Sequence, residues 1–103
     1  ALWLSENNII HEVYHPAFKS CPGHDIWKRD FTGSASVFSF TFVDNVSSKQ
    51  VETFINALHI FKIGLSWGGV TSLAVVYPDL VRPNKDFGGR LVRLILALRQ
   101  LMI

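Results

Sequence analysis

The chain has 103 residues, of which 49% are hydrophobic and 17% charged, and its formal net charge is +2. This length allows one domain with a modest core, and the composition argues against disorder. The basic residues are scattered, which excludes the electrostatic footprint of a nucleic-acid-binding protein, and no segment has the roughly 18 apolar residues of a membrane-spanning helix. The single cysteine can form no internal disulfide, which suits a reducing compartment.

The first third of the chain predicts a helix end, a strand and a loop. The first seven residues resemble the last turns of a helix. Residues 9–14 then alternate with the period of a strand, which places Ile9, His11 and Val13 on one face. An irregular segment follows, with one short helix expected over residues 24–30.

The N-terminus has neither an initiating methionine nor a secretory signal, so we expect a fragment of a longer chain.

A strand and an amphipathic helix form the clearest predicted pair. The strand spans residues 36–43. Three phenylalanines fall on one of its faces and imply that this face is buried: Phe38, Phe40 and Phe42. The helix is expected to begin at a cap formed by Ser47 or Ser48 and to end near Leu58, with apolar residues at helical spacing on one side. Such a helix is expected to pack on a sheet.

Short strands and a long loop are predicted for the second half of the chain. Residues 60–65 and 73–77 are expected to be strands on either side of a break at Gly68-Gly69. Residues 78–89 are expected to form a loop, and residues 91–98 a final strand. Together these elements predict a small α+β layer.

Arg93 is the candidate binding residue on which the sequence places most weight. It is the one charge in the final strand, and its same-face neighbours Leu91 and Ile95 are apolar. Burying a guanidinium without a partner costs several kcal/mol, and its planar fork matches a carboxylate, so a substrate carboxylate is a suitable partner. The alternatives are a structural ion pair with Asp86 or Asp79, or a side chain that reaches solvent.

The segment Ser66-Trp67-Gly68-Gly69 offers a second candidate. It combines a hydroxyl, a large ring and two residues that let the backbone turn sharply or approach a ligand. By itself the motif is weak, because Gly-Gly between strands is more often a tight turn and a tryptophan is more often part of a core.

The segment around Cys21 has the residue types of a zinc site, in the spacing H-x3-H-x5-C-x2-H: His11, His15, Cys21 and His24. The spacing argues against it, because His11 and His15 lie in or just after a strand, where positions i and i+4 are not adjacent. Exposed or loop-packed histidines are the favoured interpretation. A nucleophilic Cys21 assisted by His24 is favoured still less, since no orienting acid is evident.

Three sequence blocks together resemble a known family. They are HPAFKSCPGHDIWKRDFTG (His15–Gly33), LSWGG followed by SL (Leu65–Leu73), and D-F-x-G-x-L-V-R-L (Asp86–Leu94). In these blocks the chain resembles the C-terminal domain of the cystathionine beta-lyases, within the Cys/Met-metabolism family of pyridoxal-phosphate (PLP) enzymes. The resemblance implies the small domain of a fold type I enzyme related to aspartate aminotransferase, with an antiparallel sheet and packed helices. Residues 1–103 would be this one domain, and the large cofactor-binding domain would lie outside the chain.

The resemblance also implies an activity and its residues. Ser66 and Arg93 would contact the substrate carboxylate, with Trp67 beside the pocket. The family reaction is the α,β-elimination of cystathionine to homocysteine, pyruvate and ammonia, with PLP as electron sink. The lysine that binds the cofactor would belong to the large domain, so none of the lysines here is expected to be catalytic: Lys19, Lys28, Lys49, Lys62 and Lys85.

Partners and location follow from the same resemblance: a small amino-acid substrate, a homotetramer in the intact enzyme, and a cytoplasmic location. Departures from the family pattern occur at Thr71, Arg90, Ala97 and Arg99. They leave open a non-catalytic interaction module of the same fold, which would self-associate, and a related cystathionine gamma-synthase or gamma-lyase fragment. The isolated chain is expected to be inactive.

Overall fold

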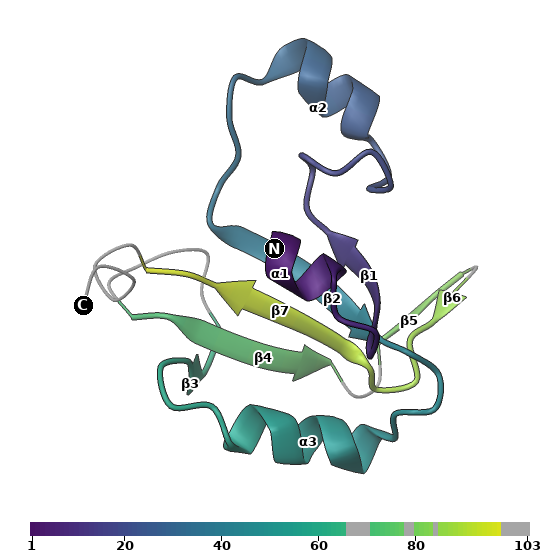
Figure 1. Ribbon diagram of the computed structural model, residues 1–103, viewed down its shortest axis with the longest axis vertical. Coiled ribbons are helices and arrows are strands. Elements are labelled where there is room, and N and C mark those ends of the chain that lie inside the picture. The colour runs from purple at the N-terminus through teal and green to yellow at the C-terminus, as the bar shows by residue number, and fades with distance from the viewer. Residues whose placement is uncertain (66–70, 78–79, 84, 98–103) are drawn as a thin grey trace.

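A single mixed sheet organises the chain (Figure 1). The computed structural model describes residues 1–65, 71–77, 80–83 and 85–97. Five strands lie side by side in this order: β1 (Ile10–Tyr14), β2 (Val37–Phe42), β7 (Leu91–Ile95), β4 (Leu73–Tyr77) and β3 (Lys62–Ile63). The other elements that the structure describes are α1 (Leu2–Ser5), α2 (His24–Asp30), α3 (Ser48–Asn56), and a hairpin of β5 (Val81–Arg82) and β6 (Lys85–Asp86).

The pairing confirms an α+β layer but corrects the expected antiparallel sheet. β1 with β2, β2 with β7 and β7 with β4 pair antiparallel, whereas β3 and β4 pair parallel, with Lys62 opposite Leu73. An alternating pattern carries no information on strand direction, so the parallel pair could not be read from it. The final strand of the prediction, shortened to Leu91–Ile95, becomes the centre of the sheet.

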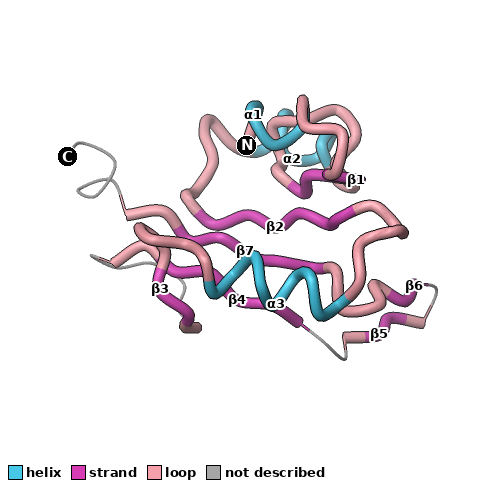
Figure 2. The backbone as a smooth tube through the Cα atoms, turned by 60° about the horizontal axis from the view of Figure 1, so that its bottom comes forward, coloured by secondary structure: helices cyan, strands magenta, loops and turns pink. Residues whose placement is uncertain are grey.

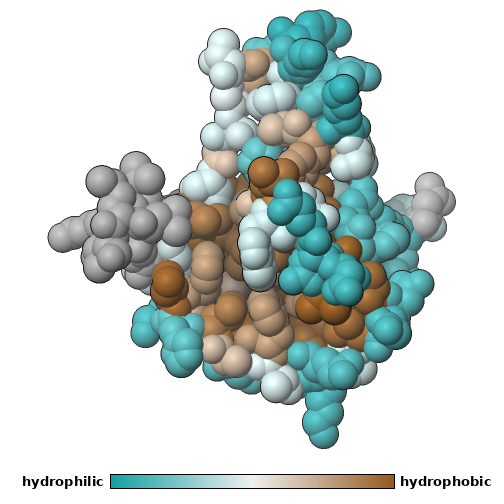
Figure 3. All heavy atoms as spheres, in the orientation of Figure 1, coloured by the Kyte–Doolittle hydropathy of each residue, from teal (hydrophilic) through white to brown (hydrophobic). Residues whose placement is uncertain are grey.

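The phenylalanine face of β2 is buried, as predicted. Phe38, Phe40 and Phe42 are only 7%, 0% and 4% exposed. Helix α3 packs on this face through Val51 and Ile55, which are both buried. Figure 2 shows the helix lying along the sheet. In the orientation of Figure 1, apolar side chains gather over the middle of the molecule, with hydrophilic ones at its margins (Figure 3).

Helix α3 begins as its sequence predicts. Ser47 is the N-cap, and its hydroxyl accepts a hydrogen bond from the backbone N–H of Gln50 at 3.2 Å. The Gln50 side chain accepts in turn from the backbone N–H of Ser47 at 2.9 Å, which completes a capping box. Two of the amide donors at the helix start therefore have partners.

A bulge in β1 corrects the predicted alternation. Ile10 pairs with Phe42 and Glu12 with the adjacent Thr41, so His11 is an extra residue on this strand. A bulge of this kind reverses the alternation that follows it. Ile10 and Val13, predicted on opposite faces, both pack against the core, whereas Ile9 and His11 are exposed.

The segment predicted as a loop over residues 78–89 contains the β5–β6 hairpin, with Arg82 opposite Lys85. Gly88 and Gly89 then turn the chain into β7 with φ of 57° and 74°, backbone conformations that favour glycine.

By contrast, the short helix over residues 24–30 and the strand over residues 73–77 are confirmed with the predicted bounds. None of the helices in the described ranges is long and apolar enough to cross a membrane. The cytoplasmic location stays a prediction.

Candidate functional site

Arg93 lies in the central strand of the sheet. In register it stands between Ser39 of β2 and Val75 of β4. Leu91 and Ile95, which share its face, are buried as the sequence suggested, and Arg93 itself is half-buried. The guanidinium thus emerges from an apolar stretch on the sheet face opposite the phenylalanines.

An aromatic ring lies next to this guanidinium. The central guanidinium carbon of Arg93 is 5.7 Å from the centroid of the Tyr77 ring, within the range of a cation–π contact. Of the two ion-pair partners considered, Asp86 accepts from the backbone N–H of Gly88 at 2.8 Å, and no ion pair joins it to Arg93 in the part of the chain that the structure describes. Asp79 lies outside the described residues.

A straight cross-strand row connects Arg93 to the edge of the sheet. Tyr14 of β1 is opposite Ser39 of β2, and Ser39 is opposite Arg93 of β7. Directly opposed residues point to the same face, so the three side chains stand in line. Because opposed Cα atoms lie about 5 Å apart, Tyr14 and Arg93 are separated by about 10 Å across the sheet. We call this the Tyr14–Arg93 row.

A hollow of about 380 Å³ opens beside this row, and we call it the hairpin hollow. Its lining includes Tyr14, Cys21, Ser39, Lys85, Phe87 and Leu91. Two of these residues adjoin Arg93, since Ser39 is its register partner and Leu91 precedes it by two residues on the same face. The hollow and the guanidinium are therefore neighbours on one face of the sheet.

The sequence reasoning missed Tyr14, Ser39 and Tyr77. Ser39 could have been noticed as a small polar residue on the face opposite the phenylalanines. Its position beside Arg93, however, depends on a strand register that no local pattern gives. Two of the predicted site residues, Ser66 and Trp67, lie outside the described residues, so their predicted role is neither supported nor contradicted here.

The histidines and the cysteine of the possible zinc site do not act together, and two of the histidines form hydrogen bonds to different backbone groups. His24 Nδ1 donates to the carbonyl oxygen of Pro16 at 2.6 Å, whereas His15 Nδ1 accepts from the backbone N–H of Ala17 at 3.2 Å. Within the described ranges, no group of three or more His, Cys, Asp or Glu side chains could hold a metal ion. Burial raises the pKa of the Cys21 thiol, which disfavours the nucleophilic thiolate.

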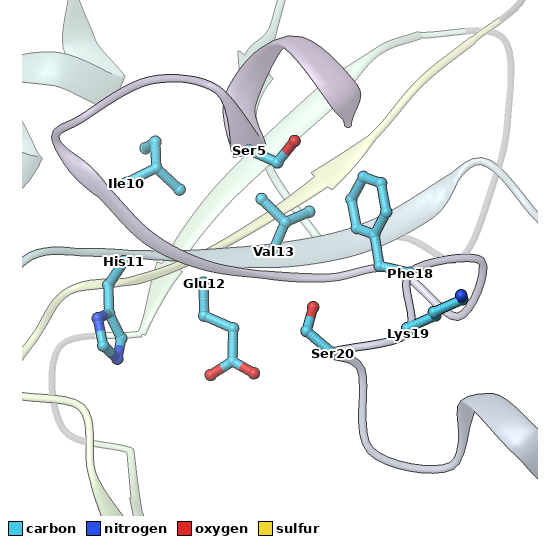
Figure 4. Close-up of a pocket in the computed structure, with 8 residues that line it drawn as sticks. All are labelled: Ser5, Ile10, His11, Glu12, Val13, Phe18, Lys19 and Ser20. Carbon is cyan, nitrogen blue, oxygen red and sulfur yellow. The ribbon is translucent and has the colours of Figure 1, made fainter.

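A further hollow, of about 550 Å³, lies at the edge strand β1. Its side chains do not converge: Figure 4 shows Ile10 and Val13 on one side of the strand and His11 and Glu12 on the other. Without convergent polar groups, this hollow offers no catalytic arrangement.

The hairpin hollow offers no lysine suited to bind PLP covalently. A lysine that binds PLP covalently must present a neutral amine. The hydrogen bond to Tyr14 raises the pKa of Lys85, with a further contribution from Glu12, and so holds this lysine in its charged form. No other lysine lines the hairpin hollow.

Comparison with known proteins gives a consistent result. A family model described as "Cys/Met metabolism PLP-dependent enzyme" matches residues 1–81. The chain is 41% identical over 99 residues to a cystathionine beta-lyase of Haemophilus influenzae, covering 90% of this chain and 25% of that protein. It is 36% identical over 104 residues to the cystathionine beta-lyase MetC of Escherichia coli, covering 95% of this chain and 26% of that protein. The chain thus spans about a quarter of the length of these relatives.

The fold also matches a solved structure. A cystathionine gamma synthase of Xanthomonas oryzae pv. oryzae, solved with aminoacrylate and cysteine, superposes with a TM-score of 0.79 at 23% identity. The match covers 99% of this chain and 29% of that one. At this identity the likeness shows the fold alone, and it agrees with the PLP-enzyme fold expected from the sequence. Which domain of such an enzyme the chain forms stays a prediction.

Proposed function

The chain belongs to the Cys/Met-metabolism family of PLP-dependent enzymes, and we propose that it forms the substrate-carboxylate-binding part of a cystathionine beta-lyase-like enzyme. In this proposal it is the small C-terminal domain, and the remainder of the intact enzyme holds PLP. The intact enzyme, a homotetramer, cleaves the carbon–sulfur bond of cystathionine by α,β-elimination. The isolated chain binds and orients substrate without performing the chemistry.

The position of Arg93 is the observation that supports this proposal. A guanidinium offers two parallel N–H donors that match the two oxygens of a carboxylate. Half-burial between Ser39 and Val75 reduces competition from water, and the Tyr77 ring limits the orientations that the guanidinium can take. An arginine so placed binds a carboxylate more strongly and more directionally than an exposed one.

Ser66 and Trp67 complete the proposed contact. The Ser66 hydroxyl would donate to the carboxylate that Arg93 holds, and Trp67 would flank the substrate side chain. With the α-carboxylate fixed, rotation of the amino acid about its own axis is restricted, and the bond to be broken is presented in one orientation. This orientation is the contribution that the chain makes to the reaction.

Binding of a matched ligand pair tests the proposal. L-methionine carries the α-carboxylate, and L-methioninamide replaces it with an uncharged amide. In an NMR titration of the full chain, we expect binding of methionine in the millimolar range and at least tenfold weaker binding of the amide, since a hydrogen bond to a charged group contributes about 1.5–3 kcal/mol.

Two arginine variants sharpen this test. Arg93→Met should weaken methionine binding at least tenfold. Arg29→Met is the matched control, because the Arg29 side chain is 73% exposed and pairs with the adjacent Asp30. Equal binding of methionine and methioninamide, or an Arg93→Met chain that binds as well as the Arg29→Met chain, would contradict the proposal. The dispersion of the same spectra reports whether each variant is folded.

A further inference from the structure

The guanidinium of Arg93 lies to one side of its own strand. We propose that Tyr77 is a positioning residue that holds this guanidinium over β4, so that the substrate carboxylate binds beside β4 and not beside the hairpin hollow. This inference rests on the function proposed for Arg93. It adds the residue that orients the guanidinium and the side of β7 on which the ligand lies.

Strand register places Tyr77 within reach of Arg93. Arg93 of β7 is directly opposite Val75 of β4. Tyr77 follows Val75 by two residues, so it lies on the same face of the sheet and diagonal to Arg93. Diagonal neighbours are about 7–8 Å apart, a span that a long side chain and an aromatic ring can bridge. The central guanidinium carbon of Arg93 is accordingly 5.7 Å from the centroid of the Tyr77 ring.

The contact with Tyr77 decides between the two strands that flank Arg93. The direct partner of Arg93 on the other side is Ser39 of β2, which leads along the Tyr14–Arg93 row to the hairpin hollow. A guanidinium that lies over the Tyr77 ring extends toward β4, away from β2 and from that hollow. The hollow has a cation of its own, Lys85, whose Nζ lies 5.2 Å from the Tyr14 ring centroid. The two cations therefore rest on two tyrosines at separate places on one sheet face.

A cation–π contact suits a positioning role. It draws on the charge of the guanidinium and the face of the ring, and it does not need the N–H donors that a carboxylate takes. An arginine side chain has many rotamers, and ordering such a side chain on binding costs free energy. A guanidinium that the Tyr77 ring already holds loses less freedom when the ligand arrives. Tyr77 thus acts on the ligand through Arg93.

An NMR titration of the unmodified chain with L-methionine locates the ligand. Leu73, Val75 and Tyr77 share the face of β4 next to the guanidinium, and all three are half-buried. The resonances of Val75 and Tyr77 should therefore shift on binding, together with the Nε–H resonance of Arg93. Those of Ser39 and Tyr14 should stay in place. Shifts at Ser39 and Tyr14 as large as those at Val75 and Tyr77 would refute the inference.

Two variants of Tyr77 test the role of its ring. Tyr77→Leu removes the ring and should weaken methionine binding about three- to fivefold, the factor that a partly exposed cation–π contact gives. Tyr77→Phe keeps the ring and should bind within about twofold of the unmodified chain. Tyr14→Leu is the matched control, because Tyr14 is also a half-buried tyrosine at the end of its strand but lies under Lys85. It should bind methionine as the unmodified chain does.

A double substitution separates positioning from a general structural effect. In the Arg93→Met chain, adding Tyr77→Leu should cause no further loss of methionine affinity, because Tyr77 acts through the guanidinium. A further loss of the same size would show that Tyr77 acts independently of Arg93 and would overturn the inference. A Tyr77→Phe chain that binds as weakly as Tyr77→Leu would overturn it too. If Tyr77→Leu does not fold, the shifts of the unmodified chain still decide the question.

The outcomes distinguish this inference from the proposed function. If Tyr77→Leu leaves methionine affinity unchanged while Arg93→Met lowers it tenfold, the positioning role is wrong and the role of Arg93 stands. If the Arg93→Met chain binds methionine as well as the Arg29→Met chain does, the proposed function fails. The positioning role of Tyr77 then fails with it.

Discussion

Replacing Phe40 by alanine should strongly destabilise the domain. Phe40 is completely buried, and it stands in register between Val13 of β1 and Val92 of β7. Its ring meets the rings of Phe42 and Phe54 edge to face, with centroid distances of 5.4 Å and 6.3 Å. Truncating a buried phenylalanine costs about 3–5 kcal/mol, and each aromatic pair contributes about 0.5–1.5 kcal/mol beyond its buried area. Because two aromatic pairs are lost as well, we expect the free energy of unfolding to fall by an amount near the top of the first range, about 4–5 kcal/mol.

Urea unfolding followed by far-UV circular dichroism measures this loss. Small domains have a free energy of unfolding of about 5–15 kcal/mol, so Phe40→Ala can approach complete unfolding. Phe40→Leu, with an expected loss of about 1–2 kcal/mol, keeps the comparison measurable in that case. Phe31→Ala is the control, since Phe31 is 64% exposed, and should change stability by less than about 0.5 kcal/mol. If Phe40→Ala cost no more than this control, the described core would be wrong.

Two further stability predictions follow from local contacts. Ser47→Ala should lower the free energy of unfolding by about 1 kcal/mol because it removes the capping box of α3, and a cost no larger than that of Ser48→Ala in urea unfolding would argue against the cap. Burial lowers the pKa of His15 from its ordinary value of 6.5, so the unfolded chain takes up the proton first. The His15 contribution to stability is therefore complete above pH 6.5 and is lost as the pH falls through the folded-state pKa. Urea unfolding at several pH values should show that the free energy of unfolding depends less steeply on pH in His15→Gln. An unchanged slope would contradict this assignment.

Elements governed by local patterns could be predicted from the sequence. The alternating phenylalanines located β2 and its buried face, and the serine cap with helical spacing located α3. In both segments the signal lies within ten residues and depends on the period of the element alone. The short helix α2 and the strand β4 were located for similar reasons.

Features that depend on pairing between distant segments could not be predicted. The bulge at His11 exists because β1 must match the register of β2, and the parallel contact of β3 depends on the course of the chain between β3 and β4. The β5–β6 hairpin lies in a segment whose proline and charged residues favour a loop.

The candidate site likewise has one part that a local pattern reveals and another that depends on strand pairing. Arg93 was recognisable as a charge in an apolar strand, whereas its neighbours Ser39 and Tyr77 became visible only through the sheet.

The central position of β7 has a consequence for the order in which the protein can fold. β2 and β4 each pair with β7 and not with each other, and β7 is the last of the described strands in the chain. During synthesis, the β1–β2 pair can therefore form before β7, but the sheet stays in two halves until residues 91–95 leave the ribosome. The edges of β2 and β4 that await this strand are unpaired in the nascent chain, and long-range pairing of this kind is slow. A nascent chain paused before Leu91 thus exposes two strand edges that can pair with other chains.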